Sequence, residues 1–161
     1  MVELFVNLGQ IHSLKSKGIL TTIGLGSCVG VTLYDSVVKV GVMGHIFLPK
    51  RRGSDNSAAA APGKYADTGI PAMVKEALNL GAQKSRLQAK VAGGANLFPN
   101  LHLDAISIGE QNIIAITKHL DNYKIPILGR DILGNHGRKM RLTVENGIVT
   151  VTAIGKEPIQ I

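Results

Sequence analysis

Apolar and polar side chains recur with two different periods along this chain, and the longer period predicts two helices. Between residues 67 and 80, apolar positions follow the i, i+3, i+4, i+7 spacing of one helix face, and Gly81 suits a helix end. Residues 109–123 carry a second stripe of this kind, which Pro126 closes. We therefore expect two main helices, at 67–80 and 109–123.

Most of the remaining chain consists of short apolar or alternating runs that are typical of strands. These runs lie at residues 19–24, 29–34, 39–48, 89–92, 125–129, 138–144 and 148–154. Because strands outnumber helices and several follow one another closely, the pattern predicts an α+β domain with mostly antiparallel sheet and helices on one side. The longest connection, at 49–63, exceeds a typical loop and is therefore expected to be functional or mobile.

One predicted hairpin carries its own turn signal. Asn146 and Gly147 form a dipeptide that favours a type I′ turn. That turn pairs Val144 with Val149, Leu142 with Val151 and Met140 with Ala153. Because all six are apolar or small and share a face, we expect this hairpin to cover one side of the core.

Length and composition indicate a globular protein of one domain, spanning residues 1–161. The chain is 45% hydrophobic and has one cysteine, so an intramolecular disulfide is excluded and a reducing compartment fits. No apolar run approaches the roughly 18 residues of a spanning helix, and the first residues lack the basic start of a secretory signal. We therefore expect a cytoplasmic protein without direct membrane insertion.

The charge balance narrows the choice of partners. Lys and Arg number 18 against 11 Asp and Glu, and the net charge of +7 favours acidic partners. Aromatic residues make up only 4%, and no nucleic-acid motif accompanies the basic run at 50–52, so we do not expect nucleic acid as a partner. The histidines, the cysteine and the carboxylates show no strong zinc spacing. We expect neither a metal nor another cofactor.

The most informative stretch is the glycine-rich sequence TTIGLGSCVG at 21–30, which leads into the single cysteine. Its glycine spacing is not that of a dinucleotide loop, and a strand rather than a helix follows, which argues against a phosphate site. A lone cysteine is more often an inert buried residue. The alternative is a nucleophile, which needs a base nearby to form the thiolate.

His45, in the next predicted strand, is a candidate for that base. If the loop between the two strands has two or four residues, Cys28 lies directly opposite His45 on one sheet face, whereas a three-residue loop separates them. Gly24 and Gly26 allow a tight turn ahead of the cysteine. The backbone N–H groups of this turn, at Gly26, Ser27 and Cys28, can face a developing oxyanion. Thr22 precedes the turn and is a candidate to orient the imidazole, although threonine is also a common strand residue.

Taken together, these residues resemble the CheD-type chemoreceptor glutamine deamidases of bacterial chemotaxis. The similarity begins with GLGSCV at 24–29 and GHIFLP at 44–49. It continues at 63–67, 90–98, 108–112 and 134–138, in the family's order and over nearly the whole chain. Two positions depart from the family pattern: Leu97 stands where Met is usual, and Leu133 where a second glycine is usual.

The resemblance implies hydrolysis of specific glutamine side chains on methyl-accepting chemotaxis receptors to glutamate, with release of ammonia. It assigns the nucleophile to Cys28, the base to His45 and the orienting role to Thr22. It also implies a layered α/β/β fold like that of toxin-type cysteine deamidases, and a regulatory complex with a CheC-type chemotaxis phosphatase. The alternative is a non-catalytic basic module that binds receptors or this phosphatase.

Basic residues that follow the candidate base are expected to dock the receptor. Receptor signalling regions are helical and typically rich in carboxylates, whereas this chain is basic. Lys50, Arg51 and Arg52 follow His45 by only a few residues, and Lys64 lies in a block that matches the family. We expect these four side chains to lie at the rim of the site.

Overall fold

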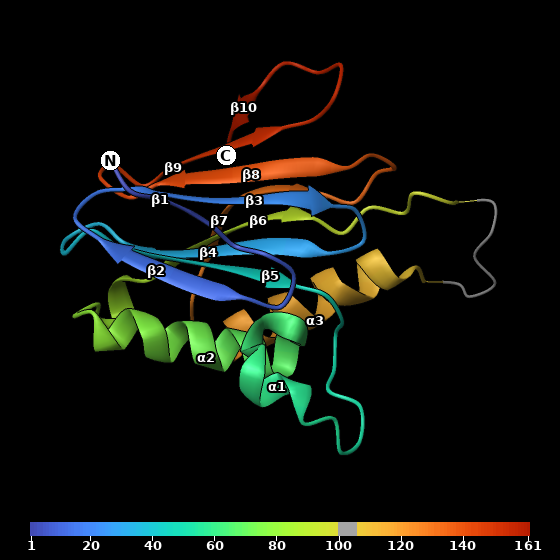
Figure 1. The fold of residues 1–161 in the computed structure, drawn as a ribbon, viewed down its shortest axis with the longest axis horizontal. Coiled ribbons are helices and arrows are strands. Elements are labelled where there is room, and N and C mark those ends of the chain that lie inside the picture. Colours follow the sequence, from blue (N-terminus) through green and yellow to red (C-terminus); the bar gives the residue numbers. More distant parts are fainter. Residues whose placement is uncertain (100–105) are drawn as a thin grey trace.

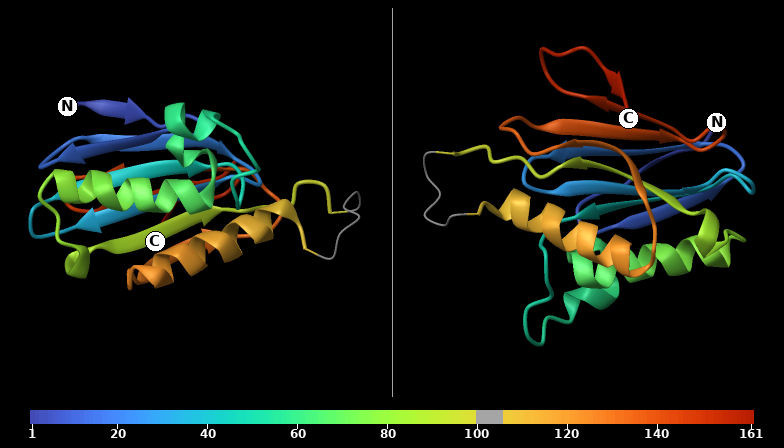
Figure 2. Two further views of the ribbon diagram at one scale, coloured as in Figure 1. Left: turned by 90° about the horizontal axis from the view of Figure 1, so that it is seen from below. Right: turned by 180° about the vertical axis from the view of Figure 1, so that it is seen from behind.

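The computed structural model describes residues 1–99 and 106–161, which form three stacked layers (Figure 1). Two five-stranded sheets lie face to face, and helices α2 (Ala66–Asn79) and α3 (Ile108–Asn122) cover the free face of one of them (Figure 2). The predicted α+β class, with mostly antiparallel strands, two main helices and α/β/β layers, is confirmed.

We call the sheet beside the helices the inner sheet and the other one the outer sheet. The inner sheet has the order β2 (Ile11–Lys15), β5 (Val40–Ile46), β4 (Val29–Asp35), β6 (Gln88–Gly93) and β7 (Ile127–Ile132). The outer sheet has the order β1 (Glu3–Phe5), β3 (Ile19–Leu25), β8 (Arg138–Thr143), β9 (Ile148–Thr152) and β10 (Ile159–Gln160). Two of these pairs, β1 with β3 and β6 with β7, are parallel.

Both predicted helices and all seven predicted strands are present, with most ends within two residues of those expected. The strands β1, β2 and β10 were not predicted, because two of them have three residues or fewer and β2 lacks a clear alternation. The predicted loop at 49–63 contains the short helix α1 (Ser57–Ala60) and the start of a 3-10 turn (Pro62–Lys64). Another 3-10 turn lies at Lys84–Arg86.

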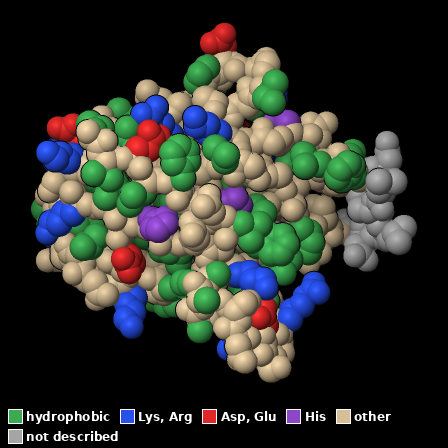
Figure 3. Space-filling model, viewed as in Figure 1, with side chains coloured by type: hydrophobic (Ala, Val, Ile, Leu, Met, Phe, Trp, Pro, Cys, Tyr) green, Lys and Arg blue, Asp and Glu red, His purple; other side chains and the backbone are tan. Residues whose placement is uncertain are grey.

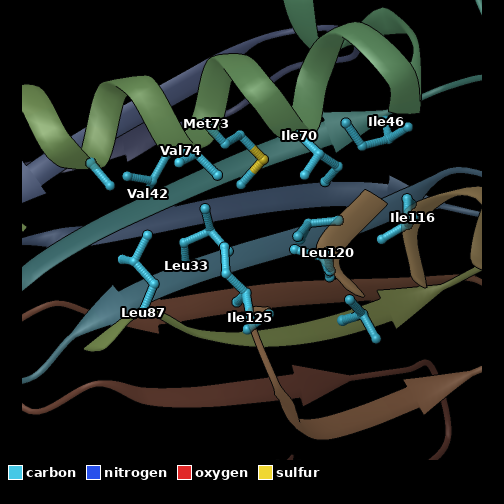
Figure 4. Packing of buried hydrophobic residues seen from close by; sticks show 14 of the residues in the cluster. Leu33, Val42, Ile46, Ile70, Met73, Val74, Leu87, Ile116, Leu120 and Ile125 are labelled. Atoms are coloured by element: carbon cyan, nitrogen blue, oxygen red, sulfur yellow. The ribbon is translucent and has the colours of Figure 1, made fainter. Parts of the chain in front are cut away.

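Two apolar layers hold the sheets and helices together. Between the helices and the inner sheet, Leu33 and Val42 pack against Ile70, Met73 and Leu120 (Figure 4). A second cluster fills the space between the two sheets and contains Leu20, Met43, Met140, Leu142 and Val151. Because the inner sheet is covered on both faces, all residues of β4 and β5 are buried, which explains their continuous apolar character.

The β8–β9 hairpin keeps the predicted faces, but the predicted turn is wrong. A connection of four residues pairs Leu142 with Val149 rather than with Val151. Gly147 has a φ of +75°, whereas Asn146 lacks the positive φ that a type I′ turn requires. Because the register moves by two residues, an even number, the same apolar side chains still face the core.

Among the described residues, no helix has the length and apolar character that crossing a membrane requires.

Candidate active site

The three strands that carry or adjoin the candidate residues meet at one end of the two sheets, on the right in Figure 1. Strand β3 of the outer sheet contains Thr22, and β5 of the inner sheet contains His45 near its end. Cys28 lies directly before β4, and its side chain belongs to the apolar cluster between the sheets. The candidate site therefore spans the interface of the two sheets.

The register of β4 and β5 differs from the expected one. Gly30, not Cys28, lies opposite His45, because the turn joins Asp35 to Val40. The expectation of a directly opposed pair is therefore wrong by two residues. Cys28 lies one residue before the first ladder pair, Val29 with Ile46. Its side chain belongs to the cluster between the sheets, which is also the side on which His45 meets Thr22 of the outer sheet.

Gly30 is a position of close contact between the sheets that was not predicted from the sequence pattern. A Cβ atom at this position would lie 2.8 Å from the Met140 sulfur and 3.2 Å from Cγ2 of Thr22. Glycine here lets the outer sheet approach the inner sheet closely at the position opposite His45. A glycine within an otherwise apolar strand was the available signal for this close approach.

Hydrogen bonds fix the orientation and the tautomer of the His45 ring. Oγ1 of Thr22 lies 2.8 Å from Nδ1 of His45 and 2.6 Å from the carbonyl oxygen of Val6. Since a carbonyl only accepts, the Thr22 hydroxyl donates to Val6, and its oxygen accepts from Nδ1–H of His45. Nε2 is then the unprotonated nitrogen. It is buried and makes no hydrogen bond to any described atom, so it is free to accept a proton.

Residues 6–10 surround His45 and were not expected to contribute. The backbone N–H of His45 donates to the carbonyl of Gln10, and its carbonyl accepts from Gly9. Val6 in turn donates its N–H to the carbonyl of Thr21. The N-terminal segment thus links the orienting threonine to the strand that carries the imidazole.

Burial controls the protonation of both candidate reacting groups. Desolvation raises the pKa of the Cys28 thiol, an effect that the Cys28 backbone N–H partly offsets. Desolvation lowers the pKa of the His45 imidazole. The nearby backbone carbonyl of Val6 favours the protonated ring and partly offsets this effect. Both shifts favour the neutral forms of the two groups.

The turn that precedes Cys28 is braced by glycine and by the loop after β6. Gly24 has a φ of +71° at a break in the β3–β8 register, and the N–H of Gly26 donates to its carbonyl. The N–H of Gly94 donates to the carbonyl of Cys28, and a Cβ at Gly93 would lie only 2.3 Å from that oxygen. The backbone around Cys28 is therefore fixed from both sides.

Comparison with known proteins assigns the chain to a family. A profile described as CheD chemotactic sensory transduction matches residues 47–153. The chain belongs to the CheD family. The chemoreceptor glutamine deamidase CheD of Thermotoga maritima is 39% identical over 150 residues, which cover 93% of this chain and 91% of that protein. Probable chemoreceptor glutamine deamidases CheD from Caldanaerobacter subterraneus and Pyrococcus abyssi are 45% and 41% identical over 154 residues, 94% of this chain and 93% and 92% of theirs.

The two departures from the usual CheD pattern both lie close to the Cys28 turn. A Cβ at Gly26 would lie 2.9 Å from Cδ1 of Leu97, so this leucine packs directly on the turn. Leu133 has a φ of +66° and donates its N–H to the carbonyl of Gly93. A leucine in the left-handed region is strained, whereas glycine adopts this conformation readily.

The four docking candidates of this CheD chain differ in how free their side chains are. Lys64 Nζ lies 3.1 Å from Oδ2 of Asp55, and Nε of Arg51 donates to the carbonyl of Asp55. Lys50 and Arg52 are exposed, in a part of the chain that projects beyond the helices (Figure 1). In the surface view, Lys and Arg side chains are visible in this lower part and also at the left edge and in the upper part (Figure 3). Arg51 and Lys64 thus brace the segment, which leaves Lys50 and Arg52 as the freer pair.

Two hollows flank the Cys28 turn. One, of about 510 Å³, adjoins Gly24 and is lined mainly by residues 136–139 and 152–154. The other, of about 170 Å³, adjoins Ser27 and is lined by Leu97 and Phe98, among other residues. Within the described ranges, no three His, Cys, Asp or Glu side chains are grouped to hold a metal ion.

Proposed function

We propose that this chain hydrolyses the side-chain amides of specific glutamines on methyl-accepting chemotaxis receptors, giving glutamate and ammonia. The names of the similar CheD proteins, which match more than 90% of the chain, support this activity. The observation that carries the chemistry is the unpartnered Nε2 of His45, at the same interface between the two sheets as the single cysteine.

The first half of the proposed reaction forms a thioester. Nε2 of His45 takes the proton from Sγ of Cys28, and the thiolate attacks the carboxamide carbon of the glutamine. The N–H groups of Ser27 and Cys28 are the proposed donors to the oxyanion, because the N–H of Gly26 is engaged by Gly24. The imidazolium then gives its proton to the amide nitrogen, the C–N bond breaks, and ammonia leaves.

The second half returns the enzyme to its starting state. Water gives a proton to Nε2 of His45 while its oxygen attacks the thioester carbon. The C–S bond then breaks, and the imidazolium returns the proton to the sulfur, so the products are the glutamate side chain and a neutral Cys28. Thr22 keeps the other imidazole proton on Nδ1 and stabilises the imidazolium that forms twice in the cycle.

We propose the cytoplasmic helices of the receptors as the substrate surface. The exposed pair Lys50 and Arg52 would meet their carboxylates. A CheC-type phosphatase is a proposed second partner that competes for this surface, as the family resemblance implies. Because the proposed substrate is the cytoplasmic part of the receptors, we propose that the protein acts in the cytoplasm.

The proposal is tested by incubating a receptor cytoplasmic fragment with the protein and mapping glutamine-to-glutamate conversion by mass spectrometry. Cys28→Ala and His45→Ala should fold normally and give no conversion above background, since a nucleophile and its base act as a unit. Conversion by folded Cys28→Ala would exclude the mechanism. Receptor binding by the wild type without any conversion would favour the adaptor alternative.

A further inference from the structure

A buried amide from the helix layer contacts both segments that carry the reacting groups. Asn112 of α3 has no exposed surface. Its Nδ2 lies 3.0 Å from the carbonyl oxygen of Ser27 and 3.0 Å from that of Phe47. Ser27 directly precedes the nucleophile, and Phe47 lies two residues after the base.

The contacts determine which way the amide points. Both partners are carbonyl oxygens, which only accept, so the NH₂ group must face them and donate both of its protons. A flipped amide would place its oxygen against two other oxygens. In the observed orientation, Oδ1 is buried without a partner among the described atoms. An unpaired buried acceptor is costly, which a side chain of purely structural value would be expected to avoid.

The position of Asn112 coincides with the place where the β4–β5 ladder opens. The last pair of that ladder is Val29 with Ile46. Beyond this pair, the segment before β4 forms the turn of Ser27 and Cys28. The segment after β5 diverges from it, because the N–H of Phe47 donates to the carbonyl of Lys64. The two N–H bonds of Asn112 replace the missing ladder contact and join the two diverging strand ends.

The helix segment that carries Asn112 is itself fixed to the site. Ser107 caps α3 by accepting from the N–H of Glu110. A Cβ at Gly109 would lie 2.4 Å from the carbonyl oxygen of Gly94, whose N–H binds the carbonyl of Cys28. The first turns of α3 therefore cannot move independently of the Cys28 backbone.

We propose that Asn112 is a positioning residue for the deamidation reaction. Its amide holds the Cys28 turn and the end of the His45 strand at the spacing that proton transfer between Sγ and Nε2 requires. The catalytic part of this inference rests on the proposed function, whereas its effect on the thiol does not involve the receptor.

The test compares Asn112→Ala and Asn112→Ser with the matched control Gln111→Ala. Gln111 is the adjacent amide on α3, and its Nε2 donates to the carbonyl of Ile106, away from the site. For each variant we measure thermal unfolding, the rate of Cys28 alkylation by iodoacetamide as a function of pH, and kcat and KM on the receptor fragment. The pH profile and the split between kcat and KM separate positioning from a general loss of stability.

We expect folded Asn112→Ala to lose about 10²-fold in kcat, since misplacing reacting groups by an ångström has an effect of this size. Its KM stays within about twofold, because binding contacts are untouched. Cys28 alkylation near neutral pH slows, because the thiol no longer has its base at the right spacing. Asn112→Ser, which retains one donor, is intermediate, and Gln111→Ala matches the wild type.

The proposal is overturned if either kcat or the alkylation profile of folded Asn112→Ala matches the wild type, or if Gln111→Ala shows the same losses. It is also overturned if neither Asn112 variant folds, because the residue is then required by the fold itself. If the wild type converts no receptor glutamine, the proposed function fails separately. In that case the alkylation profiles alone decide whether Asn112 positions the thiol.

Discussion

Oγ1 of Thr22, in the outer sheet, lies 2.8 Å from Nδ1 of His45, in the inner sheet. This hydrogen bond crosses the interface between the two sheets, and both of its partners are buried. The geometry of the proposed site therefore depends on how the sheets pack against each other, as well as on the loop that carries the proposed nucleophile, Cys28.

Replacing Thr22 by Val should lower kcat by about 10- to 100-fold, as is typical when the group that orients a histidine is removed. Valine keeps the shape of threonine but cannot accept from Nδ1–H, so the ring loses its fixed tautomer. Thr22→Ser retains the hydroxyl and should stay close to the wild type. Steady-state kinetics on a receptor fragment check both variants, and wild-type turnover by Thr22→Val would mean that Thr22 is only a strand residue.

The pH dependence should follow from the direction of the His45 shift. Burial lowers the pKa of His45 below 6.5, so the acid limb of kcat/KM should have its midpoint below that value. The unfolded chain binds this proton more readily than the folded chain. The stabilising contribution is therefore complete above the unfolded pKa and is lost as pH falls through the folded pKa.

Urea unfolding at several pH values measures this loss of stability directly. His45→Gln, which has no titrating ring, should lose less stability than the wild type when pH is lowered from about 7.5 to about 5. Equal losses in the two proteins would show that other groups dominate the acid response.

Receptor docking should depend on Lys50 and Arg52 more than on Arg51 and Lys64, which are engaged by Asp55. The double variant Lys50→Ala/Arg52→Ala should raise KM several-fold, weaken the salt dependence of KM and leave kcat nearly unchanged. The double variant Lys75→Ala/Lys118→Ala removes the same charge from exposed helix positions and serves as control. If both double variants change KM equally, only net charge matters.

Leu133→Gly should stabilise the protein by about 1 kcal/mol, because Leu133 adopts a φ of +66° that costs a leucine roughly 1–2 kcal/mol. Leu133 is 37% exposed, so its truncation loses less packing than that of a fully buried leucine. The opposite substitution, Gly147→Leu, should destabilise the protein, because Gly147 has a φ of +75° and a Cβ there would also lie 2.5 Å from the Tyr34 ring. Thermal or urea unfolding of both variants provides the measurement, and a lower midpoint for Leu133→Gly would contradict the strain argument.

The faces of the sheets were predictable from sequence, whereas the register was not. A register that moves by two residues leaves the same side chains on the same face, so the alternation of apolar residues cannot detect the change. The placement of Cys28 and His45 on the side between the sheets therefore agrees with the pattern, although the residue opposite His45 is Gly30. The packing of the complete sheet, which no local pattern contains, selects the register.

Contributions from the main chain and from polar residues in apolar stripes were harder to predict. Val6 supplies a carbonyl oxygen to Thr22, and no side-chain pattern announces such a role. Asn112 lies on the same helix face as Ile116 and Leu120, four and eight residues later, and both are buried. A polar residue within a buried stripe was the one signal that pointed to it.

The hydrogen bonds that begin at His45 and pass through Thr22 end at the backbone carbonyl of Val6. The site therefore tolerates substitution of the Val6 side chain. Any residue that keeps position 6 in its place beside β3 presents the same oxygen, because every amino acid carries it. Position 6 is therefore free to vary among side chains that fit between the sheets, while the path of the N-terminal segment is not. Sequence variation there would be a poor guide to its catalytic importance, and insertions or deletions between residues 6 and 10 would be far more damaging than substitutions.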